Sequence, residues 1–132
     1  MQLGATLYIH NTQEAAALYQ QAFGLTLGYS ALNPDGSYLH ASLCRDGQEI
    51  FAVSESRNDA LVSLLCSADI RTNRPIANLG LDFPTEAKVR HAFALLAKEG
   101  TVTLPLQALP WCPFAGEVVD KNGVYWYIYL KQ

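Results

Sequence analysis

Stretches of alternating apolar and polar residues dominate the chain, and two segments with helical periodicity interrupt them. In the first half, Thr12 is a plausible helix N-cap and Gly24 a plausible helix end. Turn signals at Asn33-Pro34-Asp35-Gly36 and at Asp46-Gly47 separate the later strands. The pattern therefore predicts one strand, one helix and three strands, over residues 4–9, 12–23, 25–31, 37–44 and 49–54.

The second half repeats this order. Four residues of the first half have counterparts 72 positions later: Leu7, Ile9, Glu14 and Ala15 correspond to Leu79, Leu81, Glu86 and Ala87. The predicted elements are a strand over 76–82, a helix from its N-cap Thr85 to about Lys98, and strands over 101–104, 116–120 and 124–130. A loop rich in proline, with Pro105, Pro110 and Pro113, is expected before the strand over 116–120. A doubled sheet usually closes around a shared cavity.

Residues 55–75 join the two repeats. The run from Ala60 to Cys66 is too apolar for a simple linker, and we favour packing or an interface over a lid for it. The predicted organisation is a single domain of two modules, about 1–56 and 74–132, joined by this linker.

Strand alternation predicts two different faces for each sheet, because successive side chains of a strand point to opposite sides. In the first strand Leu7 and Ile9 oppose Tyr8, and in the last strand Trp126 and Ile128 oppose a row of tyrosines. The aliphatic face suits a covering helix. The other face carries tyrosine, histidine, asparagine and small residues, and we interpret it as a ligand pocket. The alternatives are a solvated face or a dimer interface.

Composition narrows the classes of function. Half of the 132 residues are apolar, which is enough for a packed core without disulfides or metals. The net charge is -3, and the nine lysines and arginines are scattered, so neither nucleic acid nor an anionic membrane is an expected partner. No segment approaches the roughly twenty apolar residues that span a bilayer, and the N-terminus has no signal-peptide pattern.

The cysteines indicate a reducing compartment. Cys44, Cys66 and Cys112 are odd in number and widely spaced, without a Cys-x-x-Cys pair, which argues against a disulfide framework and a zinc knuckle. We therefore expect free thiols and a cytoplasmic protein.

Candidate chemistry is sparse. His40 is the best candidate for proton transfer, because imidazole titrates near neutral pH and this one is expected to face the pocket. Trp111 could form a wall or gate of the cavity, or could simply pack beneath its loop. No Ser-His-Asp order, phosphate-binding loop or dinucleotide fingerprint is present, so no catalytic residue is assigned.

Several short motifs, in order along nearly the whole chain, carry a family resemblance. They are Glu14-Ala15-Ala16 to Tyr19, Phe23-Gly24, His40-Ala41 with Leu43, the run 100–106, Trp111, Gly116, Val119-Asp120-Lys121, Gly123-Val124 and Trp126. The sequence resembles the vicinal oxygen chelate superfamily, which includes glyoxalase I, bleomycin and fosfomycin resistance proteins and extradiol dioxygenases, and within it the PhnB-like subgroup. The resemblance implies an α+β fold of paired βαβββ modules that form a curved mixed sheet around a cavity, and it implies a homodimer.

Metal-dependent members of that superfamily take histidine and glutamate ligands from the first and last strands of each module. Carried over, the four positions fall near Gly4, Phe51, Asn78 and Tyr127. None of these is a good ligand for a divalent metal, so the resemblance predicts no metal and no cofactor. A register shift of two in the fourth strand would bring in Glu49, which makes a His40 and Glu49 pair conceivable.

The leading prediction is a metal-independent protein that binds or sequesters a small organic molecule. The expected ligand-binding residues are Tyr8, His40, Phe51, Asn78, Trp111, Tyr125 and Tyr127. The alternative is an enzyme of the lyase, isomerase or oxygenase type that uses His40, with or without a recruited divalent metal. A third possibility is an interaction module that binds a protein through the cupped face or through Ala60 to Cys66.

Overall fold

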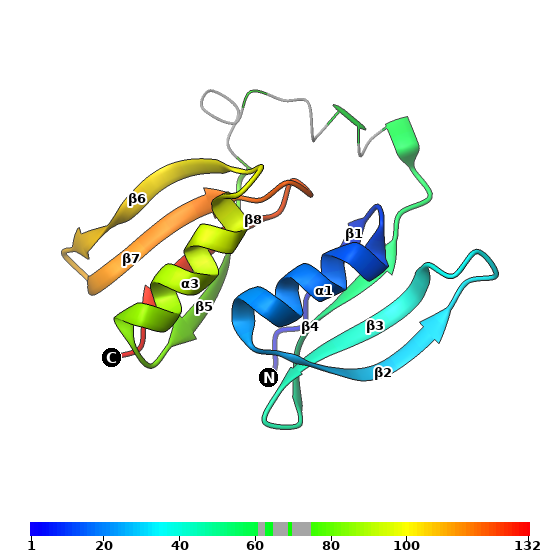
Figure 1. The fold of residues 1–132 in the computed structure, drawn as a ribbon, viewed down its shortest axis with the longest axis horizontal. Helices are drawn as coiled ribbons and strands as arrows, with labels where there is room; N and C mark the ends of the chain where they lie inside the picture. Colours follow the sequence, from blue (N-terminus) through cyan, green and yellow to red (C-terminus); the bar gives the residue numbers. More distant parts are fainter. Residues whose placement is uncertain (61–62, 65–68, 70–74) are drawn as a thin grey trace. The chain divides into compact units, whose positions relative to one another are not determined.

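The computed structural model describes residues 1–60, 63–64, 69 and 75–132. The chain divides into two compact units, Met1–Ser63 and Leu64–Gln132, each with one four-stranded sheet and one covering helix (Figure 1). Most of the apolar run from Ala60 to Cys66 lies outside the described residues, and so does Cys66. Within the described part of the chain, no helix has both the length and the apolar character needed to cross a bilayer.

Unit 1 follows the predicted order of elements. They are β1 (Thr6–Ile9), α1 (Thr12–Phe23), β2 (Thr26–Leu32), β3 (Tyr38–Arg45) and β4 (Gln48–Glu55). The strand order is β1-β4-β3-β2, with β1 parallel to β4 and the other pairs antiparallel. The helix α1 packs on β3 and β4.

The core of unit 1 lies between α1 and one face of the sheet. Tyr19 of α1 is fully buried, and its ring meets Phe51 of β4 edge-on, with centroids 5.5 Å apart. Phe23 stacks on Tyr19 at 5.7 Å. Such aromatic contacts add about 0.5–1.5 kcal/mol each beyond the area they bury. The helix is therefore fixed to the sheet by a small aromatic cluster.

The start of α1 differs from the prediction. Asn11, not Thr12, is the N-cap, with a left-handed φ of 54° and no hydrogen bond from its side chain. Glu55 replaces the usual cap: its carboxylate accepts the N–H groups of Asn11 and Thr12, each at 3.1 Å. Thr12 is buried instead, where its hydroxyl donates to Glu55 and accepts the N–H of Tyr38. Glu55 is far in sequence from the start of α1, so this cap could not be predicted from the neighbouring residues.

A bulge in the β3–β4 hairpin decides which residues share a face. The turn residues Asp46 and Gly47 both have positive φ, 53° and 77°, as a two-residue hairpin turn requires. Leu43 then pairs with Phe51, whereas Cys44 pairs with Glu49, so Ile50 is the extra residue on β4. Phe51 is thereby placed in the core, with only 2 % of its surface exposed. The expectation that Phe51 faces the ligand pocket is wrong, because the bulge turns it toward α1.

Unit 2 repeats this arrangement. Its elements are β5 (Leu79–Phe83), α3 (Glu86–Ala97), β6 (Thr101–Leu109), β7 (Cys112–Val119) and β8 (Tyr125–Leu130). The strand order is β5-β8-β7-β6, with β5 parallel to β8. The repeated order of strand, helix and three strands confirms the predicted α+β architecture of two βαβββ modules.

The predicted proline-rich loop is wrong. β6 continues through Pro105 to Leu109, a turn of Pro110 and Trp111 follows, and β7 includes Pro113 near its start. Because β6 is an edge strand, a proline there need not break pairing on both sides. The ladder between β6 and β7 shifts register between Leu104 and Gln107, which accommodates Pro105. Trp111 therefore lies at the tip of a hairpin rather than within a long loop.

The helix α3 begins and ends as predicted, with Thr85 as its N-cap and Lys98 as its C-cap. The hydroxyl of Thr85 accepts the N–H of Lys88 at 3.2 Å, which confirms this N-cap. At the other end Glu99 takes the left-handed conformation, with φ 63°. Gly100 lies close to two backbone carbonyl groups. A Cβ there would lie 2.5 Å from the carbonyl oxygen of Leu96 and 2.6 Å from that of Val119. The glycine allows the chain to turn closely between the helix and β7.

Candidate functional site

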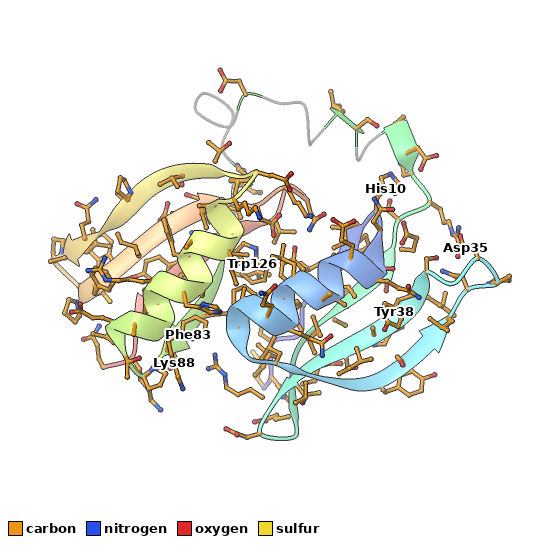
Figure 2. The ribbon with its side chains drawn as sticks, in the orientation of Figure 1. His10, Asp35, Tyr38, Phe83, Lys88 and Trp126 are labelled. Carbon is orange, nitrogen blue, oxygen red and sulfur yellow. The ribbon has the colours of Figure 1, made fainter. Side chains whose placement is uncertain are left out.

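The sheet of unit 2 has one face covered by α3 and one face that the helix does not cover, which we call the open face. Trp126 and Ile128 point toward α3 and are fully buried; Figure 2 labels Trp126. Tyr125, Tyr127 and Tyr129 alternate with them and therefore lie on the open face. Their pairing partners in β5 and β7 share this face, and these are Gly80, Asp82, Ala115, Glu117 and Val119.

Trp111 and Tyr127 meet on this open face. The indole Nε1–H of Trp111 donates to the hydroxyl of Tyr127 at 3.2 Å, although 67 % of Trp111 is exposed. Gln132 donates from its side-chain amide to the backbone oxygen of Trp111 at 3.0 Å. The ring of Tyr127 stacks on that of Tyr129, with centroids 5.0 Å apart and an angle of 26° between the planes. Three aromatic side chains thus form one continuous surface.

The hydroxyl of Tyr127 stays neutral. Burial raises the pKa of Tyr127, the indole N–H of Trp111 lowers it, and the thiol of Cys112 raises it further, so the net pKa lies above the ordinary value of 10.0. The phenol is therefore protonated at neutral pH. Its oxygen accepts the indole N–H of Trp111.

Tyr125 and Asn78 differ in how they are placed. The hydroxyl of Tyr125 donates a hydrogen bond to the carboxylate of Glu117, so these two side chains form a polar corner of the open face. Asn78 is exposed and comes one residue before Leu79, the first paired residue of β5. It lies at the rim of the sheet rather than among the tyrosines. Glu117 was not among the predicted site residues, although strand alternation would have placed it there.

Unit 1 has an open face of its own. Tyr8 pairs with Ser54, and 68 % of Tyr8 is exposed. His40 lies on β3, opposite Ser54 of the adjacent strand β4, because the neighbouring residues Ala41 and Val53 are paired. The ring centroids of His40 and Tyr29 lie 6.1 Å apart, and Tyr29 was not among the predicted site residues. The pairing of β2 with β3 shifts register between Leu27 and Ser30, so simple strand alternation does not predict which face Tyr29 lies on.

Glu49 shares the open face of unit 1 with His40. The hydroxyl of Ser42 donates a hydrogen bond to Glu49, and Ser42 lies two residues from His40 on β3. The two-residue turn at Asp46 and Gly47 sets this placement, because it pairs Arg45 with Gln48 and Cys44 with Glu49. His40 and Glu49, the alternative metal-binding pair, therefore lie on one face, and the carboxylate of Glu49 is hydrogen-bonded to Ser42.

The residues at the family's metal positions do not fit a divalent metal. Phe51 is in the core, Gly4 has no side chain, and Tyr127 is a neutral phenol that is hydrogen-bonded to Trp111. Asn78 offers only an amide. Over residues 1–60, 63–64, 69 and 75–132, no three or more His, Cys, Asp or Glu side chains come together in a group that could hold a metal ion.

A polar groove of about 450 Å³ lies at the start of α1. It is lined by Asn11, Thr12, Gln13, Glu14, Asp35, Gly36, Ser37 and Glu55. The hydrogen bonds that line this groove are internal: Glu55 caps the helix, Ser37 donates to Asp35, and Gln13 donates to the backbone oxygen of Gly36. Figure 2 labels Asp35 in the turn between β2 and β3 and His10 after β1. These contacts hold the helix, the turn and β4 together.

Glu55 is the centre of that network. Burial raises the pKa of Glu55, but the hydrogen bonds from Thr12, from Asn11 and from His10 outweigh burial, so the pKa lies below the ordinary value of 4.5. The side chain is only 12 % exposed, and His10 lies 3.5 Å from it. A charged carboxylate at a helix N-terminus is favoured by the unpaired N–H groups there. The polar residues of the groove therefore serve to cap α1, and we assign no ligand to the groove.

No family model matches the chain, and no curated protein does. Among solved structures, a PhnB protein from Bacillus cereus is 23% identical, with a TM-score of 0.74 over 99% of this chain and 100% of that one. A glyoxalase/bleomycin resistance protein/dioxygenase domain from Frankia is 13% identical, with a TM-score of 0.67 over 100% and 98%. The fosfomycin resistance protein FosX from Listeria monocytogenes, in complex with Mn(II), is 12% identical, with a TM-score of 0.64 over 100% and 93%. These matches confirm the predicted resemblance at the level of the fold. The chain has the glyoxalase/bleomycin resistance fold.

Proposed function

We propose that the chain is a metal-independent protein that binds or sequesters a small organic molecule, and that the ligand lies on the open face of unit 2. The contact between Trp111 and Tyr127 carries this proposal, because it joins an exposed indole to a stacked tyrosine pair. Aromatic surfaces with one or two polar groups are typical of sites for small organic ligands. Gly80 pairs with Tyr127 and Ala115 pairs with Tyr129, so small residues flank the tyrosine row.

The chemistry of the donor groups supports metal independence. A divalent metal needs imidazole, carboxylate or thiolate ligands, and the four family positions hold glycine, phenylalanine, asparagine and tyrosine. Trp111, Tyr127 and Tyr125 instead supply hydrogen-bond donors and ring faces. Such groups bind and orient a ligand without polarising it as a Lewis acid would.

The first test is elemental analysis of protein purified without chelator, followed by melting curves with nickel, zinc, manganese and cobalt. A ligand that binds only the folded state raises the melting temperature. We expect no metal at a near-stoichiometric level and no shift with any of the four ions. Tight binding of one ion, with a rise in melting temperature, would contradict the proposal.

A second candidate function is proton-transfer catalysis at His40, with or without a recruited metal. The observation that favours it is that His40 and Glu49 share the open face of unit 1. If it is correct, melting curves with nickel or zinc will shift, and either His40→Ala or Glu49→Gln will remove the shift. For catalysis without metal, any turnover found in a substrate screen should depend on pH and be abolished by His40→Ala.

Two further predictions from the sequence belong to this proposal. The homodimer is expected from the family resemblance, and sedimentation velocity of the full chain would contradict it by finding a monomer at micromolar concentration. The cytoplasmic location rests on the cysteines: Cys44 and Cys112 are free thiols, which persist in reducing compartments.

A further inference from the structure

We infer that the open face of unit 2 selects a flat aromatic cation over a flat aromatic anion. The inference deepens the proposed function and rests on it, since it assigns a charge and a shape to the ligand of the same face. Three features of the face support it: the ring surfaces, the positions of the carboxylates, and the positions of the basic residues.

The ring surfaces favour positive charge. The stacked rings of Tyr127 and Tyr129 and the exposed indole of Trp111 present π faces, whose electron density attracts cations. Tyr127 remains a neutral phenol, because its pKa is raised. A flat ligand can stack on these rings, and a positive charge on it would strengthen the contact.

Carboxylates border the tyrosine row on both sides. Glu117 of β7 pairs with Tyr127, and Asp82 of β5 pairs with Tyr129. The carboxylate of Glu117 accepts the hydroxyl of Tyr125, which orients it on the face. A ligand stacked on Tyr127 and Tyr129 would thus lie between two acidic residues. Opposite charges within a few ångströms attract most strongly where water is partly excluded.

Of the basic residues that the structure describes in unit 2, Arg90 and Lys121 are engaged elsewhere, and Lys131 lies at the rim. The guanidinium of Arg90 packs over the ring of Phe114 on the helix side, 4.7 Å from its centroid. Lys121 pairs with Glu99 at 3.8 Å. Lys131 follows β8 and is exposed beyond the last paired residue, Leu130. Among the paired residues of the open face that the structure describes, none is lysine or arginine.

Gly80 makes the rings accessible. A Cβ built at Gly80 would lie 3.6 Å from the ring of Tyr127 and 3.6 Å from that of Tyr129, which is ordinary contact. The missing side chain therefore leaves a shallow space beside the two rings. A larger residue there would occupy that space without removing a charge or a hydrogen bond.

The test compares two three-ring probes of opposite charge, 9-aminoacridine and 9-anthracenecarboxylate, in fluorescence titrations of the full chain. We expect the cation to bind at least about tenfold more tightly at low salt, with the preference falling as salt is added. Glu117→Gln and Asp82→Asn should each weaken the cation roughly threefold to tenfold and leave the anion unchanged or stronger. The control Glu86→Gln, an equal charge change on the helix α3, should leave both affinities unchanged.

The outcomes separate the two proposals. If both probes bind equally, and Trp111→Ala weakens both, the charge selection is wrong while the binding face stands. If the anion binds more tightly, the charge selection is also wrong. If neither probe binds to protein that melts cooperatively, the proposed function fails together with the inference. Gly80→Val keeps every charge, so loss of both probes in that variant supports the location of the site.

Discussion

At the scale of single residues, Asp120 is a carboxylate with no proposed role in ligand binding that stabilises the structure of unit 2. Its side chain, 4 % exposed, accepts the indole N–H of Trp126 at 2.9 Å and the N–H groups of Asn122 and Val124 at 2.9 and 3.1 Å. These contacts give Asp120 a structural role. One carboxylate thus ties the last turn to the core.

Asp120→Ala should strongly destabilise the protein, because it leaves three donors without their acceptor, one of them a buried indole. Each unsatisfied buried group costs about 1–3 kcal/mol, and we expect a total loss of roughly 3 kcal/mol in urea unfolding. The exposed control Glu86→Ala should change stability by less than about 0.5 kcal/mol. A loss equal to that of the control would show that the Asp120 contacts do not stabilise unit 2.

Glu55 should make stability depend on pH. Its pKa is lower in the folded protein than its ordinary value, so its stabilisation is complete above the ordinary value and is lost as the pH falls through the folded pKa. Glu55→Gln should cost about 1–2 kcal/mol at neutral pH, as loss of a helix cap does. The gap between the two proteins should narrow in urea unfolding at about pH 3. A gap that stays constant with pH would contradict the charged cap.

At the scale of the elements, strand alternation and turn residues predicted most of the fold. The hairpin at Asp46-Gly47, the N-cap Thr85 and the end of α1 at Gly24 could all be predicted because each depends on neighbouring residues. The exceptions depend on distant partners. Glu55 caps a helix more than forty positions away, and the bulge at Ile50 depends on pairing between two strands.

Two glycines should respond oppositely to the same substitution. Gly100→Ala places a Cβ within 2.6 Å of two carbonyl oxygens, so it should destabilise by about 1–3 kcal/mol. Gly80→Ala places its Cβ in ordinary contact within a strand, so it should be neutral or stabilise by up to about 1 kcal/mol. Urea unfolding of both variants checks the pair. Equal effects would contradict the close approach at Gly100.

At the scale of the whole molecule, the two repeats share a fold but carry different open faces. Unit 1 presents Tyr8, His40 and Glu49, whereas unit 2 presents Trp111 and the tyrosine row of β8. Of the predicted site residues, Trp111 and Tyr127 touch, Tyr125 shares their face, and Phe51 is in the core. The contact between Trp111 and Tyr127 could not be predicted, because it depends on the position of Trp111 in a two-residue turn between β6 and β7. The sequence had predicted a long proline-rich loop there. The doubled architecture itself followed from the repeated pattern.

The most direct test of ligand binding on the open face of unit 2 is a ¹H–¹⁵N NMR titration of chelator-treated full chain with 9-aminoacridine. The protein has two tryptophans, so it gives two indole signals: Trp111 on the open face, and buried Trp126 bonded to Asp120. Trp111→Phe assigns them. We predict that the Trp111 indole signal shifts without added metal, together with backbone signals of β8, while that of Trp126 stays nearly constant. Absence of any shift, or a shift only after a divalent metal is added, would contradict metal-independent binding at this face.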